Sequence, residues 1–209
     1  MIKVIFLDMG GIIVKEAGMQ QIELLAEHSG LSFDECKNIR RKYWSELKIG
    51  KITDEEYWIG AKKISCLKKG LLDDLGISKD KYELLRQESI EFIAPIENSE
   101  NLLKRLSKHY VLIIVSNNSY DWGENVLKRL DYEKYFLDKI FSHNVGCSKP
   151  GKEIFEIALD KIKQKIDNNS EVLFIDDKDK NLLIPKQMGI RTHLFSTYDE
   201  IYSVVRYID

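Results

Sequence analysis

The sequence predicts an α/β fold, in which a doubly wound parallel sheet carries an inserted, all-helical segment. Three short apolar runs indicate the sheet, because unbroken runs of this length are typical of strands buried on both faces. They lie at 4–7, 110–115 and 171–175. Helical patterns separate the second run from the third, and strands that alternate with helices favour right-handed βαβ units with parallel pairing.

The segment between the first two runs has helical patterns only. Ser32 with Glu35 and Thr53 with Glu56 have the spacing of capping boxes, and each pair predicts the start of a helix. We therefore predict that 15–94 is a helical domain inserted at the carboxyl edge of a core domain that consists of 1–14 and 95–209. The expected helix ends are Gly30, Gly50, Gly76 and Pro95, and the apolar group before Gly76 is Leu71, Leu72 and Leu75.

The second half of the chain alternates between the two patterns. Helices are predicted at 102–106, 122–130, 154–162 and 181–188, and Pro185 disturbs the last of them because its ring does not fit a helix interior. A short apolar run at 139–141 and a weaker strand at 192–195 complete the sheet. Thr197 and Glu200 cap a final helix with the inward residues Ile201, Val204, Val205 and Ile208.

Composition narrows the class of protein. The 209 residues include 32 basic and 34 acidic ones, so the net charge of -2 gives no reason to expect a nucleic-acid partner. The three cysteines, Cys36, Cys66 and Cys147, are far apart and form no CxxC pair, which fits a reducing compartment.

No apolar run approaches the roughly 20 residues of a membrane span. The first strand leaves no room for a signal peptide, so we expect a cytoplasmic protein without a membrane partner. Nothing in the sequence indicates an oligomeric state.

Polar residues follow each of the three apolar runs. Asp8, Ser116-Asn117 and Asp176-Asp177 would meet at one edge, since the carboxyl ends of parallel strands lie together. Three carboxylates there would repel one another without a cation, which implies a hard divalent ion such as Mg²⁺. Ser116 and Lys149 could hold phosphate oxygens, and Asp8 could attack phosphorus to form an aspartyl-phosphate.

Simpler interpretations remain for the separate pieces. Ser116-Asn117-Asn118 is also a common turn sequence, and Asp176-Asp177 could cap the helix that follows. His143 is expected to be a solvent-exposed loop histidine rather than a catalyst. The order and placement of all the pieces together favour a site.

The chain resembles the haloacid dehalogenase superfamily over nearly its whole length. The resemblance is carried by Asp8-Met9-Gly10-Gly11-Ile12 after the first strand, Ser116-Asn117 after the second, Lys149-Pro150 before a helix, and Asp176-Asp177 with Asn181 after the third. It implies that the core over 1–14 and 95–209 is Rossmann-like and that 15–94 is a small helical cap domain of the type found in phosphatase-like members.

The resemblance also implies roles for individual residues. Asp8 would be both nucleophile and metal ligand, the Gly10 carbonyl and Asp177 would complete the magnesium site, and Asp176 would bind the metal or support it. Ser116 and Lys149 would bind the phosphoryl oxygens, with help from Asn117.

Gly10 departs from the family pattern. Family phosphatases have an aspartate here that serves as general acid and base, a role worth about 10² to 10⁴ in rate. The sequence offers Lys15, Glu16 and His143 as weak substitutes.

Three functions follow from these observations. The favoured one is a Mg²⁺-dependent phosphatase of small phosphorylated metabolites, slow or selective for good leaving groups because of Gly10. The alternative is a non-catalytic, regulatory protein that binds Mg²⁺ and phosphate. A metal-free dehalogenase is disfavoured, since Asp176-Asp177 would repel a nucleophilic Asp8 to no purpose.

Overall fold

The described residues of the computed structural model are 1–29, 31–68 and 79–204. None of the helices within these ranges is long and apolar enough to cross a membrane. Some predictions fall on the remaining residues and so lie outside the described part of the chain. They are the helix end at Gly30, the group Leu71, Leu72 and Leu75 with its end at Gly76, and the inward positions of Val205 and Ile208.

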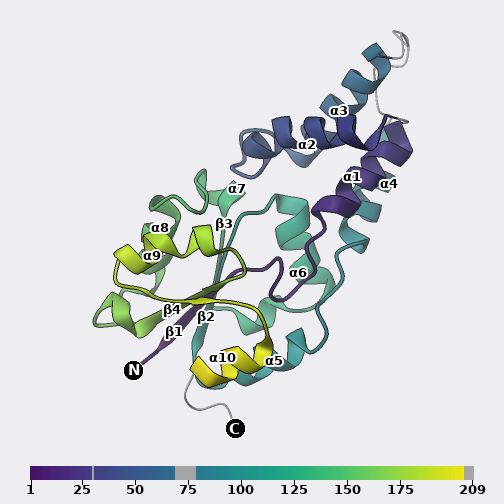
Figure 1. The fold of residues 1–209 in the computed structure, drawn as a ribbon. Helices are drawn as coiled ribbons and strands as arrows, with labels where there is room; N and C mark the ends of the chain where they lie inside the picture. Colours follow the sequence, from purple (N-terminus) through teal and green to yellow (C-terminus); the bar gives the residue numbers. More distant parts are fainter. Residues whose placement is uncertain (30, 69–78, 205–209) are drawn as a thin grey trace.

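The described residues form one five-stranded parallel sheet, which confirms the predicted fold class (Figure 1). The spatial order is β3-β2-β1-β4-β5. The chain moves outward from β1 to β3 and then returns to the other side of β1, so the switch point lies at the carboxyl end of β1. The strands are β1 (Val4–Leu7), β2 (Val111–Ser116), β3 (Asp138–Phe141), β4 (Val172–Asp176) and β5 (Arg191–Leu194).

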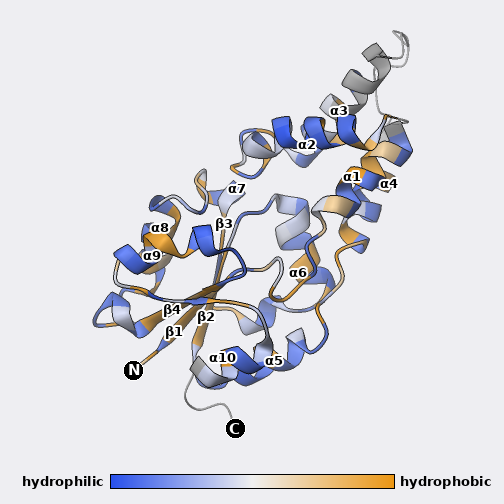
Figure 2. Ribbon diagram, viewed as in Figure 1, coloured by the Kyte–Doolittle hydropathy of each residue, from blue (hydrophilic) through white to orange (hydrophobic). Residues whose placement is uncertain are grey.

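Helices cover both faces of the sheet. Successive strand residues point to opposite faces, and the core divides accordingly: Val4 and Phe6 pack in one apolar cluster, Ile5 and Leu7 in the other. The first cluster lies under α8 and α9, the second under α5, α6 and α10 (Figure 1). The strands stand out as the hydrophobic centre of this part of the molecule in Figure 2. These helices are α5 (Ser99–Leu106), α6 (Val126–Arg129), α8 (Glu153–Ile162), α9 (Leu183–Gln187) and α10 (Tyr198–Val204).

A group of helices, here called the helical insertion, lies between β1 and α5 in the chain. Both predicted capping boxes within it are confirmed by reciprocal hydrogen bonds, Ser32 with Glu35 and Thr53 with Glu56. The helices extend away from the sheet in Figure 1. They are α1 (Gly18–Ser29), α2 (Phe33–Leu47), α3 (Asp54–Lys68) and α4 (Lys79–Glu91).

Shorter helical turns connect the remaining elements. The helix predicted at 122–130 begins as a π-helical turn, η2, and continues as α6. Pro185 lies inside α9, which is only one turn long. The turns are η2 (Asp121–Asn125), η3 (Glu133–Tyr135), α7 (Ser142–Val145), η4 (Asn169–Glu171) and η5 (Asp179–Asn181).

Two linker segments join the insertion to the sheet, and they lie side by side. Val14 bridges both Gly10 and Pro95, and the Lys15 amide donates to the Ala94 carbonyl at 2.8 Å. The entry and exit of the insertion therefore lie next to the carboxyl end of β1. The division into a core domain and a cap domain at these linkers stays a prediction.

An aromatic cluster packs the insertion against the α/β part of the chain. Trp122 in η2 contacts Trp44 and Trp58 from the insertion, with ring centroids 5.8 and 6.4 Å away. Its indole N–H donates to Ser89 of α4 at 3.1 Å. Trp58 and Trp122 are almost fully buried, so the two parts share one apolar core, as the cluster of buried residues also indicates.

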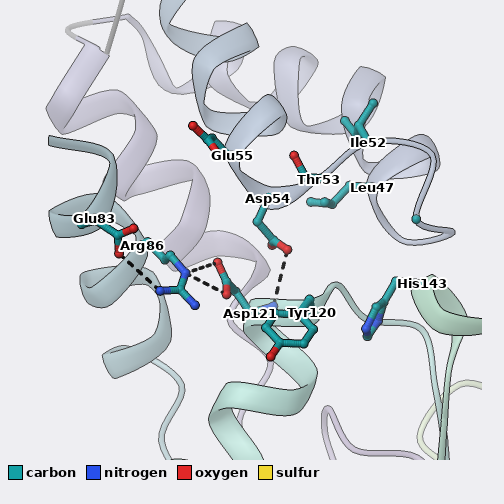
Figure 3. A pocket seen from close by; sticks show the side chains of 11 residues that line it. Leu47, Ile52, Thr53, Asp54, Glu55, Glu83, Arg86, Tyr120, Asp121 and His143 are labelled. Carbon is teal, nitrogen blue, oxygen red and sulfur yellow. Dashed lines mark hydrogen bonds and ion pairs between the residues drawn. The ribbon is translucent and has the colours of Figure 1, made fainter. Parts of the chain in front are cut away.

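A buried carboxylate forms a second contact between the insertion and η2. Asp54, at the start of α3, accepts from the Ser119 hydroxyl at 2.5 Å and lies close to Asp121 (Figure 3). Asp121 in turn binds Arg86 of α4 through both carboxylate oxygens, each 2.9 Å from Nε. Burial raises the pKa of Asp54 to about 6, and the charge of Asp121 adds to the increase.

We expect the interior of the sheet to be sensitive to loss of volume. Ile113 of β2 is fully buried, so Ile113→Ala should lower the free energy of unfolding by about 2–5 kcal/mol. Leu137, directly before β3, is 55% exposed, and Leu137→Ala should change it by no more than about 0.5 kcal/mol. Urea unfolding curves measure both. Equal losses in the two variants would contradict the assigned core.

Asp54 should make stability depend on pH. An unfolded Asp has a pKa of about 3.9, so the folded state holds this proton more tightly and stability falls as the pH rises from about 4 to about 6. The full cost above that range is about 3 kcal/mol. Asp54→Asn should gain stability relative to wild type by roughly this amount between pH 4 and pH 7. Glu55→Gln, an exposed neighbour, should not, and a parallel gain in that control would exclude Asp54 as the cause.

Candidate active site

The polar residues that follow β1 and end β2 and β4 meet at one edge of the sheet, as predicted. Asp8 continues the pairing of β1, since its amide donates to the Ile175 carbonyl at 3.0 Å. The Ser116 hydroxyl donates to Asp8 Oδ1 at 2.7 Å. The Met9 amide donates to the same oxygen at 2.7 Å, so Asp8 is fixed by its own backbone and by the neighbouring strand.

Lys149 enters this edge from the loop before α8. Its Nζ lies 2.9 Å from Asp8 Oδ1 and 2.6 Å from Asp176 Oδ2. The residue is only 2% exposed, and the ring of Phe174 lies 5.3 Å from the ammonium. A buried lysine is tolerated only when its charge is compensated, and these two carboxylates provide that compensation.

Asn117 fixes the backbone of the lysine loop. Its side-chain amide donates to the Lys149 carbonyl, and its carbonyl accepts from the Lys149 amide, both at 2.8 Å. The Asn117 side chain therefore acts on the position of Lys149.

The two carboxylates after β4 have different surroundings. Asp176 is fully buried, and both of its oxygens accept hydrogen bonds from Asn181 while Oδ1 also accepts from the Lys178 amide. Asp177 Oδ1 is buried as well, but no hydrogen bond from the described residues reaches it, and Lys178 Nζ is 3.6 Å away. Asp176 is thus saturated with donors, whereas Asp177 has an oxygen available.

The glycine pair after Asp8 leaves space in two different ways. Gly11 has φ +79°, and a Cβ there would lie 2.5 Å from Asp177 Oδ2, so a side chain at this position would be strained and would displace Asp177. Gly10 has no such restriction, and a Cβ would meet only Glu16 Cγ at 3.8 Å. The chain needs glycine at position 11, but its geometry does not require glycine at position 10.

The pKa values follow from burial and from the lysine. Burial tends to raise the pKa of Asp8, but Lys149, Ser116 and the Met9 amide outweigh it and hold the pKa below the usual range. Burial raises the pKa of Asp176, against the opposing charge of Lys149. The pKa of Asp177 is raised too, by burial first and then by the neighbouring carboxylates. Asp8 is consequently the carboxylate that is most firmly ionised.

A divalent cation would fit this arrangement. Asp8, Asp176 and Asp177 each offer an oxygen, and these oxygens lie within 4.8 Å of one another. The unbonded Asp177 Oδ1 is the atom that a cation would satisfy. Carboxylate oxygens are the ligands that Mg²⁺ prefers.

Asp8 opens into a cavity of about 630 Å³ between the sheet edge and the insertion. Gly10, Ser116, Asn117 and Lys149 line it with Asp8, so the cavity unites most of the predicted site residues. Lys15 and Glu16 line it too.

His143 does not line this cavity. It borders the neighbouring pocket of about 500 Å³ drawn in Figure 3, together with Asp54 and Asp121. The expectation of a solvent-exposed loop histidine was wrong, because His143 lies half-buried in α7, stacks on Phe141, and its Nδ1 is 2.9 Å from the Asn118 carbonyl oxygen.

The sequence analysis missed a set of cavity residues on α2 and at its end. Arg40, Trp44 and Lys48 all line the cavity of Asp8. They are spaced four residues apart, which places them on one stripe of a helix. That spacing is visible in the sequence, but it is a signal only once the helix is known to face the site.

A family model described as haloacid dehalogenase-like hydrolase matches residues 34–195 of the chain. Among curated proteins, drimenol cyclase drtB of Aspergillus calidoustus is 26% identical over 204 residues. The match covers 96% of this chain and 35% of that protein, so the chain spans about a third of its relative's length.

Solved structures share the fold. The HAD family enzyme bt-2542 of Bacteroides thetaiotaomicron, in complex with magnesium and inorganic phosphate, has a TM-score of 0.73 at 22% identity, covering 97% of this chain and 100% of that one. The putative hydrolase YfnB of Bacillus subtilis, bound to magnesium, has a TM-score of 0.70 at 21% identity, with coverage of 97% and 98%. The family match extends over most of the sheet and of the insertion, and with the geometry at the end of β1 it assigns this chain to the haloacid dehalogenase-like hydrolases.

Proposed function

We propose that this protein is a Mg²⁺-dependent phosphatase of small phosphorylated metabolites, with Asp8 as the nucleophile. The observation that carries the proposal is the ionised Asp8 carboxylate, which faces a cavity and has Ser116 and Lys149 beside it. Such an arrangement suits attack on a phosphoryl group, because the Lys149 ammonium can hold a charged phosphoryl oxygen. The Ser116 hydroxyl can do the same when it turns its single proton from Asp8 to the phosphoryl group. The complex of bt-2542 with magnesium and inorganic phosphate supports the choice of ligand.

In the first step the Asp8 carboxylate attacks phosphorus, and the bond between phosphorus and the ester oxygen breaks. Lys149 has three N–H donors. Asp8 and Asp176 take two of them, which leaves one for a phosphoryl oxygen. Water then attacks the phosphorus of the aspartyl-phosphate, the bond to Asp8 breaks, and phosphate leaves with the carboxylate restored.

Asp8, Asp177 and the Gly10 carbonyl are the proposed metal ligands. A bound Mg²⁺ would neutralise charge on the phosphoryl oxygens. Asp176 is assigned a supporting part, since Lys149, Asn181 and the Lys178 amide already use its oxygens. Its role is to hold Lys149 in place between two carboxylates.

The helical insertion is proposed to act as a cap of the small helical type. Its linkers pair beside Asp8 through Val14 and Pro95, so a small rotation there would move α2 over the cavity. Closure of this kind excludes water and supplies contacts that select the substrate.

Gly10 favours a second candidate, a regulatory protein that binds Mg²⁺ and phosphate without turnover. Without a carboxylate at this position the leaving oxygen must take its proton from water, and water has no base when it attacks the intermediate. The two candidates differ in turnover but not in binding.

The proposal is tested by phosphate release from a panel of sugar, nucleotide and acyl phosphates. We expect Mg²⁺-dependent release that stops with a chelator and falls below a few per cent in Asp8→Asn. Asp179→Asn changes an exposed aspartate of the same sequence region and serves as the matched control, which should keep its rate. Substantial turnover by Asp8→Asn would exclude the covalent mechanism, whereas phosphate binding without any turnover would establish the regulatory candidate.

A single substitution tests the part played by Gly10. A side chain fits at this position, so Gly10→Asp should raise turnover of an alkyl phosphate, by at most about 10² to 10⁴. An aryl phosphate, whose leaving group needs no proton, should gain little in its first step. Gly10→Ala fills the same space without an acid and should give no gain. Equally fast hydrolysis of alkyl and aryl esters by wild type would mean that another cavity residue transfers the proton.

A further inference from the structure

The cavity of Asp8 holds more positive charge than a single phosphoryl group requires. Its carboxylates are Asp8 and Glu16, and each is already paired, with Lys149 and Lys178 respectively. Four further cations line the same cavity, namely Lys15, Arg40, Lys48 and Lys180. Among the described residues, none of these four forms an ion pair with a carboxylate.

Arg40 is held in place by uncharged partners. Its Nε donates to Gln21 Oε1 at 3.2 Å, and its guanidinium lies over the Trp44 ring, 4.9 Å from the centroid. Gly18 leaves room for the group, because a Cβ there would lie 3.3 Å from Arg40 Nη2. The Arg40 guanidinium is therefore fixed in orientation, while most of its N–H donors remain available to a ligand. Burial lowers the pKa of Arg40, so the charge is partly desolvated.

Lys48 and Lys180 come from opposite sides of the cavity. Lys48 follows α2 of the insertion, and Lys180 lies in η5 after β4. Burial lowers the pKa of Lys48, and the like charge of Lys180 lowers it further. Two cations that repel each other across a cavity, beside a partly buried arginine, are stabilised when an anion binds among them.

The cavity is also much larger than a phosphoryl group. Its walls also include the apolar residues Ile22, Trp44, Ile93 and Trp122. Ligand cavities of several hundred cubic ångströms typically combine apolar walls with a few fixed polar groups. In this cavity the excess cations can serve as those fixed polar groups.

We propose that Arg40, Lys48 and Lys180 form a second anion subsite, so that the substrate carries another anionic group besides the phosphoryl group that Asp8 attacks. The second group is a carboxylate or a second phosphate, since a guanidinium binds the oxygens of either in the same forked manner. The inference rests on the proposed phosphatase function and names the substrate class of that site.

The test compares three esters of the same carbon length. They are ethyl phosphate, glycolate 2-phosphate and ethane-1,2-diol bisphosphate, which differ in the second anionic group. We expect KM for at least one doubly anionic ester to be about 10- to 100-fold below that of ethyl phosphate, as charge-assisted hydrogen bonds would give. The preferred ester identifies the second group. Equal KM values for all three would overturn the subsite.

Variants assign the preference to named residues. The ratio to follow is the KM of ethyl phosphate divided by the KM of the preferred doubly anionic ester. Arg40→Gln should bring this ratio close to one. Arg41→Gln changes an exposed neighbour on α2 and should leave the ratio as in wild type. Lys48→Gln should also reduce the ratio, and its side chain makes no hydrogen bond with the described residues, so its fold is at little risk. A ratio that survives both Arg40→Gln and Lys48→Gln would overturn the assignment.

Binding separates this proposal from the phosphatase proposal. Calorimetry of the same esters with the Asp8→Asn protein needs no turnover. Tighter binding of a doubly anionic ester, lost in Arg40→Gln, supports the subsite even if no ester is hydrolysed by wild type. Equal binding of all esters by this protein overturns the subsite even if hydrolysis of ethyl phosphate is fast.

Discussion

Lys149 is the group on which the arrangement of the site depends. A cation buried to this extent needs opposite charge and full hydrogen bonding, and it obtains both from Asp8 and Asp176. These carboxylates follow β1 and end β4, which are paired in register up to Leu7 and Ile175. A slip of one residue between the two strands would turn one carboxylate to the other face. The ion pairs therefore depend on the register of the sheet, and they also fix the loop that Asn117 binds from its other side.

The same lysine explains why neighbouring carboxylates differ in character. Asp8 shares one oxygen among three donors, and its pKa is held low. Among the described residues, Asp177 forms no ion pair with Lys149, and one of its oxygens receives no hydrogen bond. A site that must hold both a nucleophile and a cation gains from this asymmetry, because one group stays ionised by itself while the other is completed by a metal.

Much of the α/β part could be predicted because its signals are local. An apolar run such as Val4–Leu7 is buried whatever surrounds it, and the residue after it must lie at the sheet edge, so Asp8, Ser116 and Asp176 were placed correctly. Features that depend on how distant segments meet could not be predicted in this way. Arg40 and Asp54 lie on helices that the sequence indicates well, but their importance comes from contacts with the cavity and with Ser119.

His143 also shows that burial by distant segments could not be predicted from the local sequence. A polar residue after a short apolar run is usually exposed, yet stacking on Phe141 and contact with the Asn118 carbonyl oxygen bury half of it. Local sequence signals placed the residues at the sheet edge, but their expected roles as nucleophile, metal ligands and phosphate-binding groups came from the resemblance of four short segments to a family. The π-helical turn of η2 has no sequence signal that we can identify.

The aromatic cluster between the insertion and η2 has a consequence for spectroscopy. The chain has three tryptophans, and all of them, Trp44, Trp58 and Trp122, belong to this cluster. Two come from the insertion and one from the α/β part, so their emission arises where the two parts meet. No tryptophan elsewhere contributes a constant background. The protein thus contains an intrinsic fluorophore group whose spectrum and quenching report the distance between the insertion and the sheet, without any attached label.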